Sequence, residues 1–105
     1  MISQRTRQTL KMLGQLIAIT RQERMISQAA LAERLHVSRQ TVMAIEQGKQ
    51  KVSIGTVFEA AHLLGIPLFT EDSRELSGRQ SILNEFSALL PKRTRHKKPR
   101  VSDDF

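Results

Sequence analysis

The sequence predicts an all-α fold: one small helical domain over residues 1–90, followed by a basic tail over residues 91–105. Apolar residues recur at helical spacing along most of the chain. Serine stands directly before several of these patterns, where helix N-caps are expected, and glycine stands directly after some of them. No useful length of chain alternates apolar and polar residues in the manner of a strand, and no internal repeat is present. We therefore expect five helices and no sheet.

The composition bounds the class of protein. With 105 residues, 39% of them apolar, the chain can build one modest core but not two. It contains no cysteine, which excludes disulfides and thiolate metal sites and fits a reducing cytoplasm. No uninterrupted apolar run is long enough for a signal peptide core or a membrane span. We expect a soluble protein with no membrane role and no cofactor.

The net charge of +7 is unevenly distributed along the chain. Residues 1–70 carry nine Lys/Arg against four Asp/Glu, residues 71–91 carry two against four, and residues 92–105 carry six against two. Two basic regions are thus separated by an acidic one. This pattern favours a polyanionic partner, of which nucleic acid is the commonest.

The first helix is expected from about Thr6 to Arg24. Its apolar residues predict a buried stripe of Leu10, Leu13 and Ile17, broadened by Leu16 and Ile19. Ser27 is expected to cap a second, short helix that ends near His36, and Ser38 a third that runs to about Gln47. Gly48 follows the third helix as a left-handed stop.

A fourth helix is expected to start at Ser53 or Ile54 and to close at Gly65 and Pro67. Its core candidates are Val57, Phe58, Ala60, Ala61 and Leu64. The fifth pattern opens at Thr70 or Asp72 and continues despite Gly78. Its aligned apolar residues are Leu76, Leu83, Phe86 and Leu90. The tail that follows has almost no apolar residues, so we expect it to be disordered when alone.

The second and third helices meet the steric demands of a helix-turn-helix. A turn of three to four residues joins them, and Ala32 is small where they approach most closely. The apolar contacts that fix the angle between them are Leu31, Leu35, Val37, Val42 and Ile45. With that angle fixed, the first turn of the third helix can enter the major groove of DNA.

The block QAALAERLHVSRQTVMAIEQGK resembles the helix-turn-helix of the lambda-repressor-like, or XRE, transcription regulators. The resemblance covers about residues 9–69. One position departs from the family pattern: His36 stands where glycine is usual, because the backbone there tends toward positive φ. Histidine is among the residues that tolerate this region, so the motif is retained.

This resemblance implies a division of DNA contacts. Arg39 is expected to bind guanine, Gln40 adenine and the Thr41 methyl group a thymine methyl. Further base contacts are expected from Met43 and Ala44. The expected phosphate contacts are Gln28, Ser38, Lys49, Gln50 and Lys51. Because an anion would be repelled by phosphate, Glu46 is instead expected to pair internally, with Arg34 or Arg21.

The run VSIGTVFEAAHLLGIPLF is similar to HipB-type antitoxins, which repress their own operons. This similarity implies a bacterial, cytoplasmic protein that binds operator DNA and a HipA-like serine/threonine kinase toxin, with room for a further small subunit. The tail has three open roles: contact with DNA phosphates, docking on an acidic partner surface, or a linker.

A dimer is expected on independent grounds. One recognition helix contacts only a few base pairs, so specific affinity usually needs two half-sites of an inverted repeat, which a two-fold homodimer reads. The fifth helix has more apolar surface than a peripheral helix requires. The predicted interface residues are Leu68, Phe69, Leu76, Ile82, Leu83, Phe86 and Leu89.

Other classes of function have less support. The three histidines, at positions 36, 62 and 96, have no carboxylate at a ligand-like interval, and no nucleophile motif or phosphate loop is present, so no catalytic or metal site is expected. Four Phe and no Trp or Tyr give few stacking platforms for single-stranded RNA. A stand-alone XRE regulator and a protein-interaction module with this fold remain as alternatives.

Overall fold

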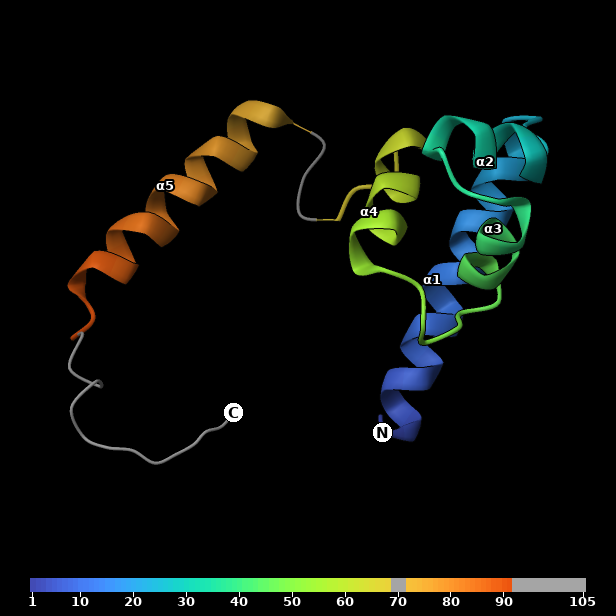
Figure 1. Ribbon diagram of the computed structural model, residues 1–105. Coiled ribbons are helices and arrows are strands. Elements are labelled where there is room, and N and C mark those ends of the chain that lie inside the picture. The colour runs from blue at the N-terminus through green and yellow to red at the C-terminus, as the bar shows by residue number, and fades with distance from the viewer. Residues whose placement is uncertain (69–71, 92–105) are drawn as a thin grey trace. The chain divides into compact units, whose positions relative to one another are not determined.

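The computed structural model describes residues 1–68 and 72–91, and within these ranges every regular element is a helix (Figure 1). The helices are α1 (Gln4–Glu23), α2 (Gln28–Leu35), α3 (Arg39–Glu46), α4 (Ile54–Leu63) and α5 (Ser73–Leu89). The predicted all-α fold with five helices is therefore confirmed. The chain divides into two units, Met1–Glu71, which holds α1 to α4, and a second that starts at Asp72 and holds α5. The roles predicted for Phe69 and for residues 92–105 lie outside the described residues.

Side-chain caps begin four of the helices. Ser3, Ser27 and Ser38 each accept a hydrogen bond from the backbone N–H three residues further on, at the starts of α1, α2 and α3. At α5 the Asp72 carboxylate accepts from the backbone N–H of Arg74. Each cap satisfies one of the backbone donors that a helix start leaves unpaired. The predicted caps Ser27 and Ser38 are confirmed, and of the two predicted openings of the fifth helix Asp72 is the N-cap.

Left-handed residues end three helices of the first unit. His36 closes α2 with φ of 58°, as expected from its place in the turn, and Gly48 and Gly65 follow α3 and α4 with φ of 72° and 76°. Met25, in the turn after α1, also has positive φ, at 60°. A long side chain rarely adopts this conformation. Nothing in the sequence pattern around Met25 had indicated it.

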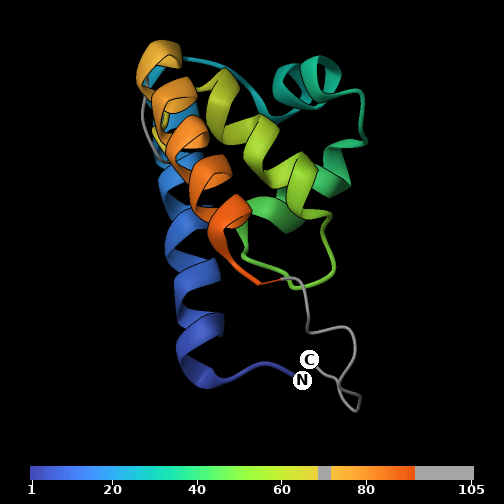
Figure 2. The same ribbon diagram turned by 90° about the vertical axis from the view of Figure 1, so that its left-hand side faces the viewer.

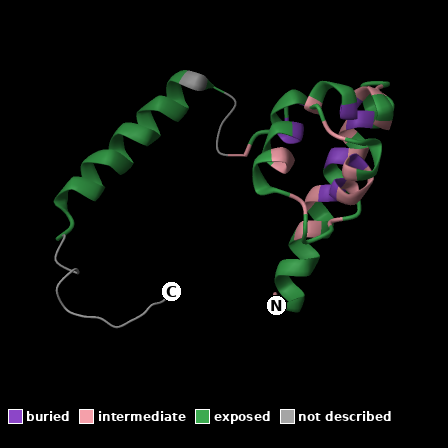
Figure 3. Ribbon diagram, viewed as in Figure 1, coloured by how far each residue is buried: buried purple, intermediate pink, exposed green. Residues whose placement is uncertain are grey.

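The core of the first unit lies between α1, α2, α3 and α4 (Figure 3). Its buried apolar side chains come from all four helices and from the residue after Gly65; they are Ile17, Leu31, Ala32, Val42, Ile45, Ala60, Ala61, Leu64 and Ile66. α1 is the longest helix of this unit. Figures 1 and 2 both show its first turns extending beyond the ends of the other helices in the unit.

Three side chains expected in the core are exposed. Leu16 and Ile19 on α1 are 46% and 53% exposed, and Phe58 on α4 is 38% exposed. The prediction was wrong because the buried stripes are narrow. On α1 the buried positions are 14, 17 and 21, and residues 16 and 19 lie well away from that line at 100° per residue. Phe58 lies about a third of a turn from the middle of the buried pair Ala60 and Ala61.

Candidate DNA-binding surface

α3 has a buried apolar side and an exposed polar side. Val42 is fully buried and Ile45 is 4% exposed, where α3 packs against α1 and α2. Ala32, on α2, is also buried in this contact. Buried residues at this spacing, three apart, leave the opposite side of the helix free. The packing therefore fixes which side chains of α3 face outward.

A glycine sets the distance between α1 and the end of α3. A Cβ atom at Gly14 would lie 2.5 Å from the carbonyl oxygen of Ile45 and 2.7 Å from that of Glu46. Real Cβ atoms do not approach backbone oxygens this closely, so only glycine fits between the two helices. The end of α3 is thus held directly against the backbone of α1.

A buried ion pair also joins these helices. The Arg21 Nε donates to Glu46 Oε2 at 2.6 Å and its Nη2 donates to Oε1 at 3.2 Å, a two-point contact. The side chains are 10% and 8% exposed. Arg21 Nη1 donates to the carbonyl of Ile26 at 2.8 Å, and Gln28 Nε2 donates to Glu46 Oε1 at 3.0 Å. The expectation that Glu46 pairs internally is confirmed, with Arg21 as the partner. The network connects α1, α2 and α3.

Two predicted phosphate ligands already make contacts within the protein. The Gln28 amide, which is half-buried, uses one N–H on Glu46 and keeps a second N–H for another acceptor. Ser38 Oγ accepts from the Thr41 backbone N–H at 3.1 Å and lies 3.0 Å from Thr41 Oγ1. Ser38 thereby orders the first turn of α3, where backbone N–H groups point outward.

The outward side of α3 carries the residues predicted to read bases. Arg39 and Gln40, in its first turn, are exposed, and Arg39 forms no ion pair among the described residues. Thr41, Met43 and Ala44 are half-buried. This row offers charged, amide and methyl groups, which are the chemical types that bind base edges in a major groove.

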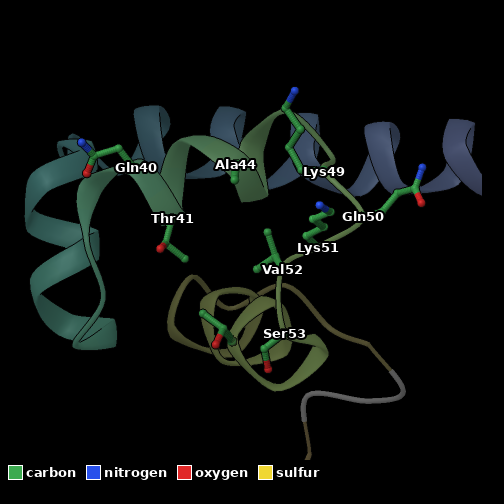
Figure 4. A pocket seen from close by; sticks show the side chains of 9 residues that line it. Gln40, Thr41, Ala44, Lys49, Gln50, Lys51, Val52 and Ser53 are labelled. Atoms are coloured by element: carbon green, nitrogen blue, oxygen red, sulfur yellow. The ribbon is translucent and has the colours of Figure 1, made fainter.

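A hollow of about 740 Å³ lies between α3, the loop after it and the start of α4 (Figure 4). Thr41 and Ala44 face Val52 and Ser53 across it. Its lining holds two lysines and no carboxylate. The lining residues are Gln40, Thr41, Ala44, Lys49, Gln50, Lys51, Val52, Ser53 and Thr56. The structure therefore brings six of the ten predicted DNA contacts to one concave surface and adds Val52, Ser53 and Thr56, which sequence reasoning missed.

A second hollow, of about 510 Å³, lies between α1 and the loop after α3. Its lining is Gln4, Arg7, Gln8, Lys11, Gln47, Gly48, Lys49 and Gln50. Sequence reasoning had assigned no site to the α1 residues or to Gln47. One signal was present in the sequence: residues 1–22 contain no carboxylate at all.

The predicted interface residues of α5 are exposed within their own unit. Leu76, Ile82, Leu83, Phe86 and Leu89 are between 44% and 80% exposed. Leu68, in the other unit, is half-buried against the core there. Among the described residues 72–91 of its unit, α5 therefore has an apolar face that no other element covers.

Residues 1–68 and 72–91 contain neither a candidate metal site nor a membrane-spanning helix. No three carboxylate or imidazole side chains there lie close enough to hold a metal ion. None of the helices in these ranges is long and apolar enough to cross a membrane.

Comparison with known proteins identifies the family. The helix-turn-helix family model HTH_3 matches residues 17–70, just over half of the 105-residue chain. No curated protein and no solved structure was found to match the chain. The matched region contains α2, α3 and α4, both faces of α3 and the larger hollow. The chain therefore belongs to the lambda-repressor-like, or XRE, helix-turn-helix family of DNA-binding transcription regulators.

Proposed function

We propose that this protein is a transcriptional repressor that reads an inverted-repeat operator with α3. The observation that carries the proposal is the contrast between the two sides of this helix. Its inner side is locked by packing and by the Arg21–Glu46 pair, and its first turn is exposed and polar beside a hollow without carboxylates. Base recognition in a major groove requires a helix that is held rigidly on its inner side and carries free hydrogen-bond donors on its outer side.

The proposed base contacts come from the outward row of α3. Arg39 supplies a bidentate donor for guanine O6 and N7, and Gln40 has the donor and acceptor that adenine N6 and N7 require. The Thr41 methyl group suits a thymine methyl, and Met43 and Ala44 add apolar contacts one turn further on. These residues carry the sequence preference of the protein.

The proposed phosphate contacts flank that row. Lys49, Gln50 and Lys51 follow α3 and are exposed. Gln28 retains one amide N–H, and Ser38 orders the N–H groups at the start of α3. Contacts of this kind set the register of a protein on DNA but carry no base information.

The test is a binding titration of the full-length protein on the DNA upstream of its own gene. Wild type is expected to prefer one inverted repeat, and Arg39→Ala is expected to lose about 1–3 kcal/mol on that site and little on scrambled DNA. Arg34→Ala is the matched control, since Arg34 is an exposed arginine outside both hollows. Equal losses in both variants, or no preferred site, would contradict the proposal.

We propose further that the repressor is a homodimer joined through the apolar face of α5, with Leu68 and Phe69 as further interface residues. Exposed leucines and a phenylalanine on one helix favour such a contact. Phe86→Glu should yield a monomer in sedimentation, and Ser81→Glu, which adds the same charge about half a turn away from the apolar face, should leave the dimer intact. A dimer that persists in Phe86→Glu would refute this interface.

The finer proposal is that the repressor is a cytoplasmic, bacterial HipB-like antitoxin that binds a HipA-like kinase toxin, with or without a further small subunit. It rests on the similarity of the sequence after α3 to HipB-type antitoxins. Light scattering of the chain mixed with the product of the adjacent gene tests it. A kinase that forms a stable complex supports the antitoxin role. A kinase that elutes alone, or an adjacent gene that encodes none, favours a stand-alone regulator.

A further inference from the structure

The first two turns of α1 add little to the core of their unit. Residues 3–9 are all exposed, and the first fully buried position of the helix is Gly14. These turns extend beyond the other helices of the unit (Figures 1 and 2), and they precede residue 17, where the family match begins. Hydrophobic burial therefore does not explain this part of α1.

The packing nevertheless holds this segment in a defined place. A Cβ at Gly48 would lie 2.8 Å from both the Cα and the N of Lys11, so the loop after α3 touches the backbone of α1. Together with the contact at Gly14, this fixes α1 at two points one turn apart. The side chains of Arg7 and Lys11 are consequently held beside Lys49 in one hollow.

The charges of this hollow are of one sign. Arg7, Lys11 and Lys49 line it, and no carboxylate does. Four glutamines, Gln4 among them, supply further amide groups around these cations. The first turn of α1 contains no acidic residue, although acids near a helix N-terminus stabilise the helix and cations there oppose its dipole. Arg7, in that first turn, is therefore placed against the preference of its own helix.

This basic surface is continuous with the hollow beside α3. Lys49 and Gln50 line both. A ligand that covers the larger hollow would reach the smaller one without a break. Gln4, Gln8 and Lys11 follow one face of α1 over about 10 Å, which is the axial length of about three phosphates of one DNA strand.

We propose that the start of α1, through Arg7, Lys11, Gln4 and Gln8, is a second phosphate-binding surface that binds the DNA backbone beside the half-site read by α3. The proposal rests on the function proposed above and extends its footprint. Arg7 supplies a planar fork of N–H donors and Lys11 a point charge, and both suit phosphate oxygens. The contacts are independent of base sequence.

The first experiment compares wild type with Arg7→Ala/Lys11→Ala on two operator DNAs. One ends at the half-sites and the other has about 10 further base pairs on each side, roughly one helical turn. On the longer DNA, two lost phosphate contacts should reduce the slope of log K against log salt by about 1.8. The advantage of wild type should then shrink about tenfold between about 50 and about 200 mM salt. On the shorter DNA the two proteins should differ little.

Matched variants separate this effect from misfolding and from net charge. Arg24→Ala/Arg34→Ala removes two exposed cations that line neither hollow and should leave the slope unchanged. Arg7→Glu places an acid in the first turn of α1, so it should maintain or raise the melting temperature while weakening DNA binding. A loss of binding that follows a loss of stability would overturn the proposal.

The outcomes distinguish this inference from the function it rests on. If wild type selects an operator and Arg39→Ala loses that selection, but the salt slope of Arg7→Ala/Lys11→Ala is unchanged, the α1 surface is not a DNA contact and the inference alone falls. The same holds if that variant loses only the complex with an acidic partner protein. If wild type selects no site, both proposals fall.

Discussion

The two sides of α3 differ in what holds their side chains. On the inner side, Val42 and Ile45 are buried and Glu46 is bound by Arg21 at 2.6 Å. On the outer side, Arg39 and Gln40 are exposed. The inner side determines where the helix stands and the outer side what it can bind. Substitutions on the two sides should therefore change different quantities, the free energy of unfolding on one and the free energy of DNA binding on the other.

The largest expected loss of folding stability follows a substitution in the buried ion pair. Arg21→Ala leaves the Glu46 carboxylate buried without its two-point partner and should lower the free energy of unfolding by about 3–5 kcal/mol, measured by urea denaturation. Replacing both, in Arg21→Met/Glu46→Leu, removes both charges and should recover most of the loss. A single variant that costs less than about 1 kcal/mol would show that the pair is not a support of α3.

The next largest loss of folding stability is expected from a substitution at the contact between α1 and α3. Gly14→Ala should lower the free energy of unfolding by about 1–3 kcal/mol, because the new methyl group meets two backbone oxygens that cannot move independently. Helix propensity alone predicts the opposite sign, a gain of about 1 kcal/mol. Gly78→Ala is the control, since a Cβ there meets nothing within 4 Å, and it should increase the helix content seen by circular dichroism. A stabilised Gly14→Ala variant would contradict the close approach.

A smaller change, a gain of folding stability, is expected from a substitution in the turn before α3. His36 has φ of 58°, in the left-handed region. A residue with a Cβ atom has a higher conformational energy there than glycine. His36→Gly should raise the free energy of unfolding, measured by urea denaturation, by up to about 1 kcal/mol, after the greater entropy loss of glycine is subtracted. His36→Val, with a β-branched side chain, should lower it. Equal stability of the two variants would refute the conformational argument.

The smallest effect on folding is expected on the outer side of α3. Arg39→Ala and Gln40→Ala should each change the free energy of unfolding by no more than about 0.5 kcal/mol, because both side chains are exposed. Urea denaturation of the same samples used for DNA binding provides the measurement. A loss of 2 kcal/mol would mean that these residues support the fold and that their effect on binding is indirect.

Local chemistry made much of this arrangement predictable from the sequence. Ser27 and Ser38 precede their helices as caps, and His36 stands at a position where the turn needs a left-handed residue. That Glu46 pairs internally could be predicted because a carboxylate beside DNA would be repelled, but the sequence did not distinguish Arg21 from Arg34 as its partner. Each of these inferences depends on a few neighbouring residues or on one charge.

The remaining features depend on contacts between segments distant in the sequence. Leu16 and Ile19 are exposed because α3 approaches α1 along a narrow line through Gly14, which apolar spacing alone cannot reveal. Arg7 and Lys11 lie beside Lys49 only because of that same approach. The apolar spacing of the fifth helix predicts the helix itself but does not identify what covers its apolar face.

The most direct test of the central claim is a cycle between one side chain and one base pair. Binding of wild type and Arg39→Ala is measured on the operator and on variants in which each guanine of a half-site is replaced in turn. If Arg39 reads a base, one replacement should cost wild type about 1–3 kcal/mol and cost Arg39→Ala almost nothing. If every replacement costs both proteins the same, Arg39 does not read the operator and α3 is not the recognition helix that its two sides indicate.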